Sequence, residues 1–299
     1  MKMRVCFAAF VLFFSLSLPA FGREVVRGEA AVNFDISTIV DWRSNEISAQ
    51  TSFNLAQAGL RLPTGRLRAE EMLQRAWPRL FRDRLLSIRV DSGTTLVDLL
   101  QSGELSLQNI DAISLGARQT APSLSPNMAN MIGRYTLPME NISRLLLTHG
   151  RPAEVEAPLI PVATSDYTGI IIIADRQLPV RGRHGTALTA PALFPRIWDT
   201  NMNLIFDRTM LTPGQTRVVR YTASENIFRP TPSGLEGELA ALAGPRPLRI
   251  FAREVFGIYT TDPVIDRQDA LRILSSANNR RLLREGRVII VLDEAMLVN

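Results

Sequence analysis

The chain has 299 residues, 46% of them hydrophobic, and a formal net charge of +5. Its single cysteine, Cys6, excludes intramolecular disulfides and thiolate metal clusters, and two histidines are too few for a histidine-rich metal site. Every basic residue after Lys2 is arginine, and the arginines are spread along the whole chain, which argues against a nucleic-acid partner. We therefore expect a globular protein with one large or two ordinary domains and no cofactor.

Residues 1–22, MKMRVCFAAFVLFFSLSLPAFG, have the organisation of a secretory signal. Lys2 and Arg4 precede an apolar run that ends at Leu18, and this run is shorter than the roughly 20 residues that a membrane-spanning helix needs. We expect cleavage after Gly22, with an uncleaved membrane anchor as the alternative. The mature protein is then expected in the periplasm or at the outer membrane, where peripheral membrane association remains open.

Residues 32–55 predict an antiparallel β-hairpin. Apolar and polar residues alternate over 32–40 and again over 47–55, as in half-buried strands. The link at 42–45 is short enough to join two antiparallel strands. The first domain is therefore expected to open with this hairpin.

Helical spacing of apolar residues follows the hairpin. Segment 66–87 predicts an amphipathic helix with Thr64 as its N-cap and a kink at Pro78, and segments 94–103 and 106–118 predict two shorter helices. A Pro/Ser-rich loop, a short strand near Tyr135 and a helix ending near Gly150 complete the first half.

The Pro-rich segment 151–164 lacks periodicity and predicts a linker. It divides an N-terminal α+β domain, residues 23–150, from a C-terminal α+β domain, residues 165–299. The second half predicts strands near 168–174, 192–198, 202–207, 217–222, 248–255 and 287–292, a loop at 229–247 and a helix at 266–277. The fold class expected is α+β, with mixed or antiparallel sheets and packed amphipathic helices.

Two apolar runs end at an aspartate, and they raise the question of catalysis. They are GIIIIAD at 169–175 and VIIVLD at 288–293. In a doubly wound enzyme the first such strand leads into a glycine-rich turn and a helix, but here Pro179 follows without a helical period. Only six residues follow Asp293. We expect both aspartates to end strands without a catalytic role, and the isoleucine run to be buried on both faces.

The remaining candidates for chemistry are few. His149 and His184 lie outside any hydrolase or metalloprotease motif, and His149 suits the end of a helix. We therefore expect no catalytic, cofactor-binding or metal-binding residues and a protein that is not an enzyme. The loop RQLPVRGRHG is either solvated and without function or a contact surface for acidic partners, formed by Arg176, Arg181, Arg183 and His184.

Three stretches of the second half carry a family resemblance: SDYTGIIIIAD at 165–175, PALFPRIWDTNMNLIFD at 191–207, and the segment 262–293 that ends in REGRVIIVLD. They resemble conserved stretches of a bacterial envelope family related to the flagellar assembly protein FlgT and to small outer-membrane lipoproteins, with secreted spirochaetal members closest. Residues 176–190 depart from the pattern by a basic insertion. The resemblance implies a non-enzymatic envelope protein and supplies no catalytic residues.

Two functions remain open at this point. The leading one is a non-enzymatic structural or interaction protein of the periplasm or envelope, whose partner is a protein or a cell-wall surface. An association with flagellar motor assembly is included in this expectation. The alternative is a periplasmic binding or carbohydrate-active protein that acts on the cell wall and uses Asp166, Asp175 or Asp199 as acids. A pocket that holds two of these carboxylates within about 10 Å would favour the alternative.

Overall fold

The computed structural model describes residues 32–229 and 231–299. The predicted signal, residues 1–22, and the predicted mature start at Arg23 therefore lie outside the described residues. Within the described ranges, the helices are too short or too polar to cross a membrane.

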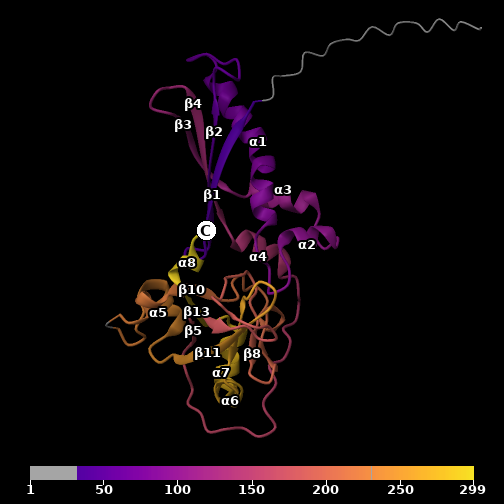
Figure 1. The fold of residues 1–299 in the computed structure, drawn as a ribbon, viewed down its shortest axis with the longest axis vertical. Coiled ribbons are helices and arrows are strands. Elements are labelled where there is room, and N and C mark those ends of the chain that lie inside the picture. The colour runs from indigo at the N-terminus through magenta and orange to yellow at the C-terminus, as the bar shows by residue number, and fades with distance from the viewer. Residues whose placement is uncertain (1–31, 230) are drawn as a thin grey trace, which may run out of the picture.

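Two sheets follow one another along the long axis of the molecule (Figure 1). The first is antiparallel, with strand order β1-β2-β4-β3, and the second is mixed, with strand order β10-β13-β5-β11-β12-β8-β9. Helices pack against both sheets. The predicted α+β class is confirmed.

The first sheet begins with the predicted hairpin. Its strands are β1 (Phe34–Asp41), β2 (Glu46–Asn54), β3 (Arg118–Leu124) and β4 (Asn130–Pro138). Val40 lies opposite Ile47, and both are buried. The sequence prediction missed β3 because Pro122 and its neighbours are typical of a loop, but a sheet edge tolerates proline, and β3 is an edge strand with a register shift at this point.

Helix α1 (Arg66–Leu86) covers one face of this sheet, and the predicted amphipathic helix is confirmed. Trp77 stacks on Tyr135 of β4, with ring centroids 3.7 Å apart. The predicted N-cap is wrong: Gly65 occupies that position, and the Thr64 hydroxyl donates to the Arg61 carbonyl instead. The helix continues through Pro78. The shorter helices are α2 (Leu96–Gln101), α3 (Leu107–Leu115) and α4 (Glu140–Leu146).

In the second sheet, β5 (Ile170–Ala174) is central and lies parallel to both of its neighbours. Every residue of β5 is buried, which confirms the prediction of burial on both faces. Ile172 faces the main core, while Ile171 belongs to a second cluster with Leu235 and Ala243. The other strands are β10 (Arg220–Ala223), β13 (Val288–Leu292), β11 (Leu248–Phe256), β12 (Asp262–Ile265), β8 (Ile197–Asp199) and β9 (Leu204–Phe206).

Short helices complete the second half: α5 (Gly237–Ala243), α6 (Arg267–Leu274), α7 (Ala277–Arg284) and α8 (Glu294–Leu297), with 3-10 turns at Arg208–Met210 and Ser224–Ile227. The prediction of a loop throughout 229–247 is wrong at α5, whose seven residues are too few for a clear helical period. Residues 151–164 contain neither helix nor strand.

The two sheets share one continuous core. Trp42, just after β1, packs edge-on against Tyr221 of β10, with centroids 6.0 Å apart. Backbone N–H groups of Leu193 and Phe194 donate to carbonyls of the segment that follows α1, at 3.0 and 2.8 Å. Val40 also exchanges backbone hydrogen bonds with Asn299. The two halves are therefore joined by hydrogen bonds as well as by apolar packing.

Candidate functional site

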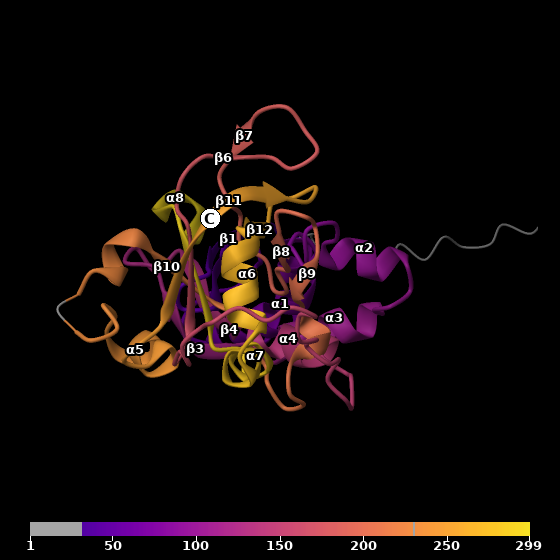
Figure 2. The same cartoon turned by 90° about the horizontal axis from the view of Figure 1, so that it is seen from below.

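The predicted contact loop is an ordered hairpin. Strands β6 (Leu178–Pro179) and β7 (Thr186–Ala187) pair antiparallel, and the hairpin projects beyond the rest of the second half (Figure 2). Two positive-φ glycines, Gly182 and Gly185, turn the chain at its tip. We call residues 176–187 the arginine hairpin.

The base of the arginine hairpin is attached to β11. Leu178 and Val180 are buried, and Val180 forms a bridge with Val255. The Arg181 backbone N–H donates to the Val255 carbonyl at 2.8 Å. Val180 also donates to the Gly185 carbonyl at 3.1 Å, which closes the turn. The base of the hairpin is thus bound to β11, and its tip projects away from the rest of the second half.

The four candidate residues occupy different environments. Arg183 and His184 are exposed at the tip. Arg181 pairs with Glu254 at 3.2 Å and donates to the Thr200 carbonyl at 3.0 Å, so this side chain stabilises the hairpin base. The sequence prediction that Arg181 is free to contact a partner is therefore wrong. Arg176 is exposed, with its guanidinium carbon 5.6 Å from the centre of the Phe251 ring.

The sequence prediction missed Phe251 as a surface residue. In β11 the residues Leu248, Ile250 and Ala252 are buried, whereas Phe251 is 53% exposed. Its neighbours in the same phase of the strand are Arg249 and Arg253. The alternation in LRIFAR already places this phenylalanine on the arginine side, and that signal could have identified it.

Asp262, in the third of the resemblance motifs, is a fully buried carboxylate. Its Oδ1 accepts from the Arg196 backbone N–H and the Thr261 hydroxyl, both at 3.0 Å, and its Oδ2 accepts from Trp198 Nε1 at 3.1 Å. Burial raises the pKa of this carboxyl above its ordinary value, although these hydrogen bonds act in the opposite direction. Asp262 thereby ties the segment PALFPRIWD to the start of β12.

The three aspartates proposed as acids in the enzyme alternative each have a local hydrogen-bond partner. Asp175 accepts from the Ser224 hydroxyl, and Asp166 accepts from the Ser276 hydroxyl. Asp199 is buried in a turn, where it accepts from the backbone N–H groups of Asn201 and Asn203 at 2.9 and 2.8 Å. Asp293, at the end of the other run, is the N-cap of α8.

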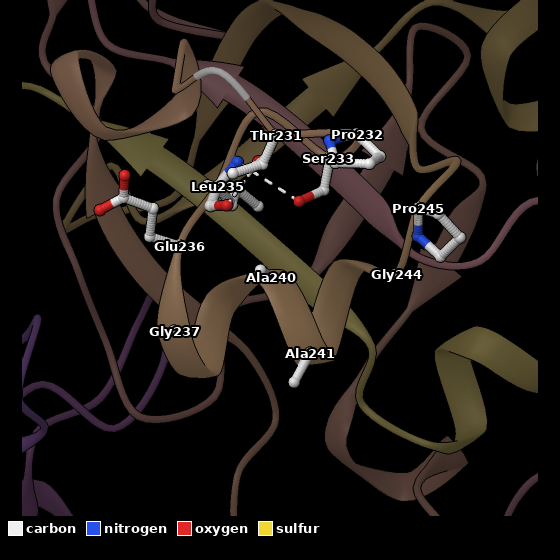
Figure 3. A pocket seen from close by; sticks show the side chains of 10 residues that line it. All are labelled: Thr231, Pro232, Ser233, Leu235, Glu236, Gly237, Ala240, Ala241, Gly244 and Pro245. Atoms are coloured by element: carbon white, nitrogen blue, oxygen red, sulfur yellow. Dashed lines mark hydrogen bonds between the residues drawn. The ribbon is translucent and has the colours of Figure 1, made fainter.

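Two pockets of about 510 Å³ each lie in the second half. Figure 3 shows the first, which surrounds α5 and the segment before it. Glu236 is the only charged residue of its lining, and the Thr231 hydroxyl donates to the Leu235 carbonyl at 2.6 Å. This pocket therefore lacks a pair of carboxylates.

The second pocket, which we call the linker groove, lies between residues 154–159, strand β9 and helix α6. Its lining includes Glu154, Glu156, Asp199 and Arg267. Of the three aspartates of the enzyme alternative, only Asp199 lines it. The described residues contain no group of three or more His, Cys, Asp or Glu side chains that could hold a metal ion.

The sequence prediction that His149 lies at a helix end is wrong. Helix α4 ends at Leu146, and His149 Nε2 lies 2.9 Å from the Leu211 carbonyl oxygen. In that contact Nε2 must carry the proton and donate it. His149 therefore connects the end of the first half to the turn after Arg208–Met210.

Comparison with protein families gives two matches. The model described as the N-terminal domain of Treponema pallidum Tp0624 matches residues 33–145, and the model described as the second domain of the same protein matches residues 169–294. No curated protein matches the chain. Neither description mentions FlgT, so that part of the resemblance is not confirmed. By these two consecutive matches, the chain is similar to Treponema pallidum Tp0624 in the N-terminal and second domains of that protein.

Proposed function

We propose that the chain is a non-enzymatic interaction protein of the bacterial envelope, exported by the signal at residues 1–22. In this proposal the second half docks to a protein or cell-wall surface through the arginine hairpin. The observation that carries it is the hairpin itself, an ordered extension that is attached at Arg181 and exposes Arg183 and His184 at its tip.

The environment of the motif carboxylates supports a scaffold. Asp262 stabilises the buried junction of β8 and β12, Asp199 orders a turn, and Asp293 caps a helix. A general acid or nucleophile needs a carboxylate that reaches the substrate from a cleft. Asp262 and Asp199 are buried among their hydrogen-bond donors and fit a structural role better.

The finer part of the proposal concerns the partner. The FlgT-like phrases PALFPRIWD and REGRVIIVLD motivate a link with flagellar motor assembly, and the excess of arginine at the hairpin favours an acidic partner surface. Because Arg181 is bound to Glu254, the hairpin residues available for such contacts are Arg176, Arg183 and His184.

The test is affinity purification after crosslinking in intact cells of the source organism. The variant Arg176→Ala/Arg183→Ala/His184→Ala removes the exposed groups and leaves Arg181 in place. The matched control carries Arg75→Ala and Arg118→Ala, two exposed arginines of the first half. The proposal expects a reproducible envelope partner with the wild type and the control, and its loss with the triple variant. An unchanged partner list would reject the hairpin as the docking element.

The linker groove favours one second candidate, a periplasmic binding or carbohydrate-active protein. Glu154 and Glu156 lie at this groove, and Arg267 lines it as well. Glu154→Gln/Glu156→Gln should then abolish binding or cleavage of purified cell-wall fragments. Wild-type protein that neither binds nor cleaves such fragments would exclude this candidate.

A further inference from the structure

We propose that the exposed face of β11 binds an extended acidic segment of a protein partner, an inference that rests on the proposed docking function and names the partner's chemistry. The surface consists of Arg249, Phe251 and Arg253 on the strand, with Arg176 and Phe228 beside them. We call it the arginine–phenylalanine surface.

Its aromatic groups are unusually open. Phe251 is 53% exposed and Phe228 is 73% exposed, whereas the buried phase of β11 packs into the core. Helix α5 and the segment before it cover the neighbouring strands β5 and β13 through Leu235 and Ala243. The sheet face over β11 thus keeps apolar area open between cationic groups, a combination that marks interaction sites.

Each phenylalanine already has an arginine over its ring. The guanidinium carbon of Arg176 lies 5.6 Å from the Phe251 centroid, and that of Arg249 lies 6.0 Å from the Phe228 centroid. A stacked guanidinium keeps its in-plane N–H groups available for a carboxylate. Arg249 uses Nη2 for the Ile227 and Ser233 carbonyls, at 3.1 and 2.8 Å, which fixes its position without neutralising its charge.

The positive charge of the surface is weakly compensated. Within the described residues, no carboxylate lies within 4.0 Å of the guanidinium groups of Arg176 or Arg249. Arg253 is 61% exposed, and its contact with Asp266 is 3.8 Å long. An exposed pair at such a distance contributes little. Carboxylates of a partner could therefore form ion pairs with three arginines whose positive charge is not already neutralised.

The spacing fits an extended peptide. Alternate residues of a strand lie about 7 Å apart, so Arg249 and Phe251 present a cation and an apolar ring at that interval. Arg253 adds a second exposed cation beyond Phe251, at the point where the register with β12 shifts. A partner strand with Glu, an apolar residue and Glu at alternate positions has the complementary order. Base stacking by a nucleic acid is less favoured, because a guanidinium occupies one face of each ring.

Peptide binding to the purified mature chain tests this inference. The probe is a fluorescein-labelled peptide with the core Ser-Glu-Ser-Leu-Ser-Glu-Ser, measured by fluorescence anisotropy at low and physiological salt. Its control has Gln in place of both Glu residues. A single-stranded oligothymidine probe measures nucleic-acid binding under the same conditions. We expect saturable binding of the acidic peptide that weakens with salt, and binding of the Gln peptide weaker by about tenfold or more.

Variants locate the site. Phe251→Ala and Arg253→Gln should each weaken the acidic peptide by about tenfold, as for central interface residues. Arg75→Gln and Arg118→Gln, which remove exposed charges on α1 and β3 of the first half, should leave the affinity within about twofold. All four positions are exposed, and circular dichroism confirms that each variant is folded.

Three results would overturn the inference: no saturable peptide binding, equal binding by the surface variants, or tighter binding of oligothymidine than of the peptide. If a cellular partner is captured through Arg183 while the acidic peptide does not bind, the docking function stands and this inference fails. If the peptide binds at β11 while crosslinking captures no envelope partner, the surface stands and the proposed function fails.

Discussion

At the scale of single residues, the aspartates show how similar motif positions acquire different roles. Asp293 ends a strand and caps the next helix, whereas Asp262 is 0% exposed and accepts hydrogen bonds on both oxygens. Asp175, from which the catalytic question arose, accepts from the hydroxyl of Ser224, the first residue of the 3-10 turn that follows β10. These carboxylates mainly hold segments together.

Asp262→Asn is expected to lower the free energy of unfolding by about 1–3 kcal/mol. The reason is that the amide replaces one accepting carboxylate oxygen with an NH₂ group, which cannot accept a hydrogen bond from the N–H or O–H donors around it. Urea unfolding of the variant and the wild type measures the loss. Equal stability of the two proteins would show that these hydrogen bonds do not hold the β8–β12 junction.

The same residue predicts a pH dependence. Because burial raises the pKa of Asp262 in the folded state, the protonated form favours folding. Its contribution to stability is complete below the ordinary aspartate pKa of about 3.9 and is lost as pH rises through the raised folded value. The wild type should show this downward slope in unfolding free energy with pH, and Asp262→Asn should lack it. Parallel pH profiles for the two proteins would contradict the assignment.

At the scale of elements, β5 and β11 show two patterns of burial in one sheet. The strand IIIIA is buried on both faces between parallel neighbours, while β11 alternates between core and surface. An unpaired charge in the first strand has to be desolvated, but a charge at an exposed position of the second does not.

Ile172→Asp should therefore abolish soluble expression, since an unpaired buried charge costs several kcal/mol. The matched control is Phe251→Asp on the adjacent strand, which should yield soluble, folded protein because this position is half exposed. Soluble yield and circular dichroism compare the two. Folded Ile172→Asp protein would mean that β5 is not buried as described.

A turn between β11 and β12 gives the second prediction at this scale. Gly257 has φ +104°, and a Cβ added there would lie 2.3 Å from Ser92 Cβ and 2.9 Å from the Ser92 carbonyl oxygen. Gly257→Ala should cost more than about 2 kcal/mol, whereas Gly182→Ala, at φ +77° with open space around it, should cost only the backbone strain of about 1–2 kcal/mol. Equal losses in urea unfolding would refute the close approach of Ser92.

Sequence patterns predicted the elements with strong periodicity. The alternation in 32–55 and the helical spacing in 66–87 correspond to β1, β2 and α1. Strand β3 was missed because its edge position tolerates Pro122, and α5 was missed because it is only seven residues long. The hairpin arginines were identified from composition, but the Arg181–Glu254 pair joins residues 73 positions apart, which local sequence cannot show.

At the scale of the whole molecule, the two sheets share a core and are linked by backbone hydrogen bonds. Trp42 and Tyr221 meet across the junction, and Leu193 donates to the Arg89 carbonyl. Such contacts favour coupled unfolding of both halves. The hairpin and the face of β11 are then carried on one stable unit.

Scanning calorimetry of the mature chain should therefore show one cooperative transition. Trp42→Ala should lower its midpoint, because the side chain is buried and removal of a core tryptophan costs about 3–5 kcal/mol. The exposed Arg75→Ala substitution on α1 should leave the midpoint nearly unchanged. Two separate transitions in the wild type would contradict the shared core.

The most direct test of the docking account is a photo-crosslinking amino acid placed at position 183, at the hairpin tip, in living cells. The same group at position 75, on the exposed side of α1, is the control. The account predicts one reproducible envelope protein or cell-wall adduct from position 183 that is missing from position 75. Adducts that are absent at position 183, or identical at both positions, would contradict it.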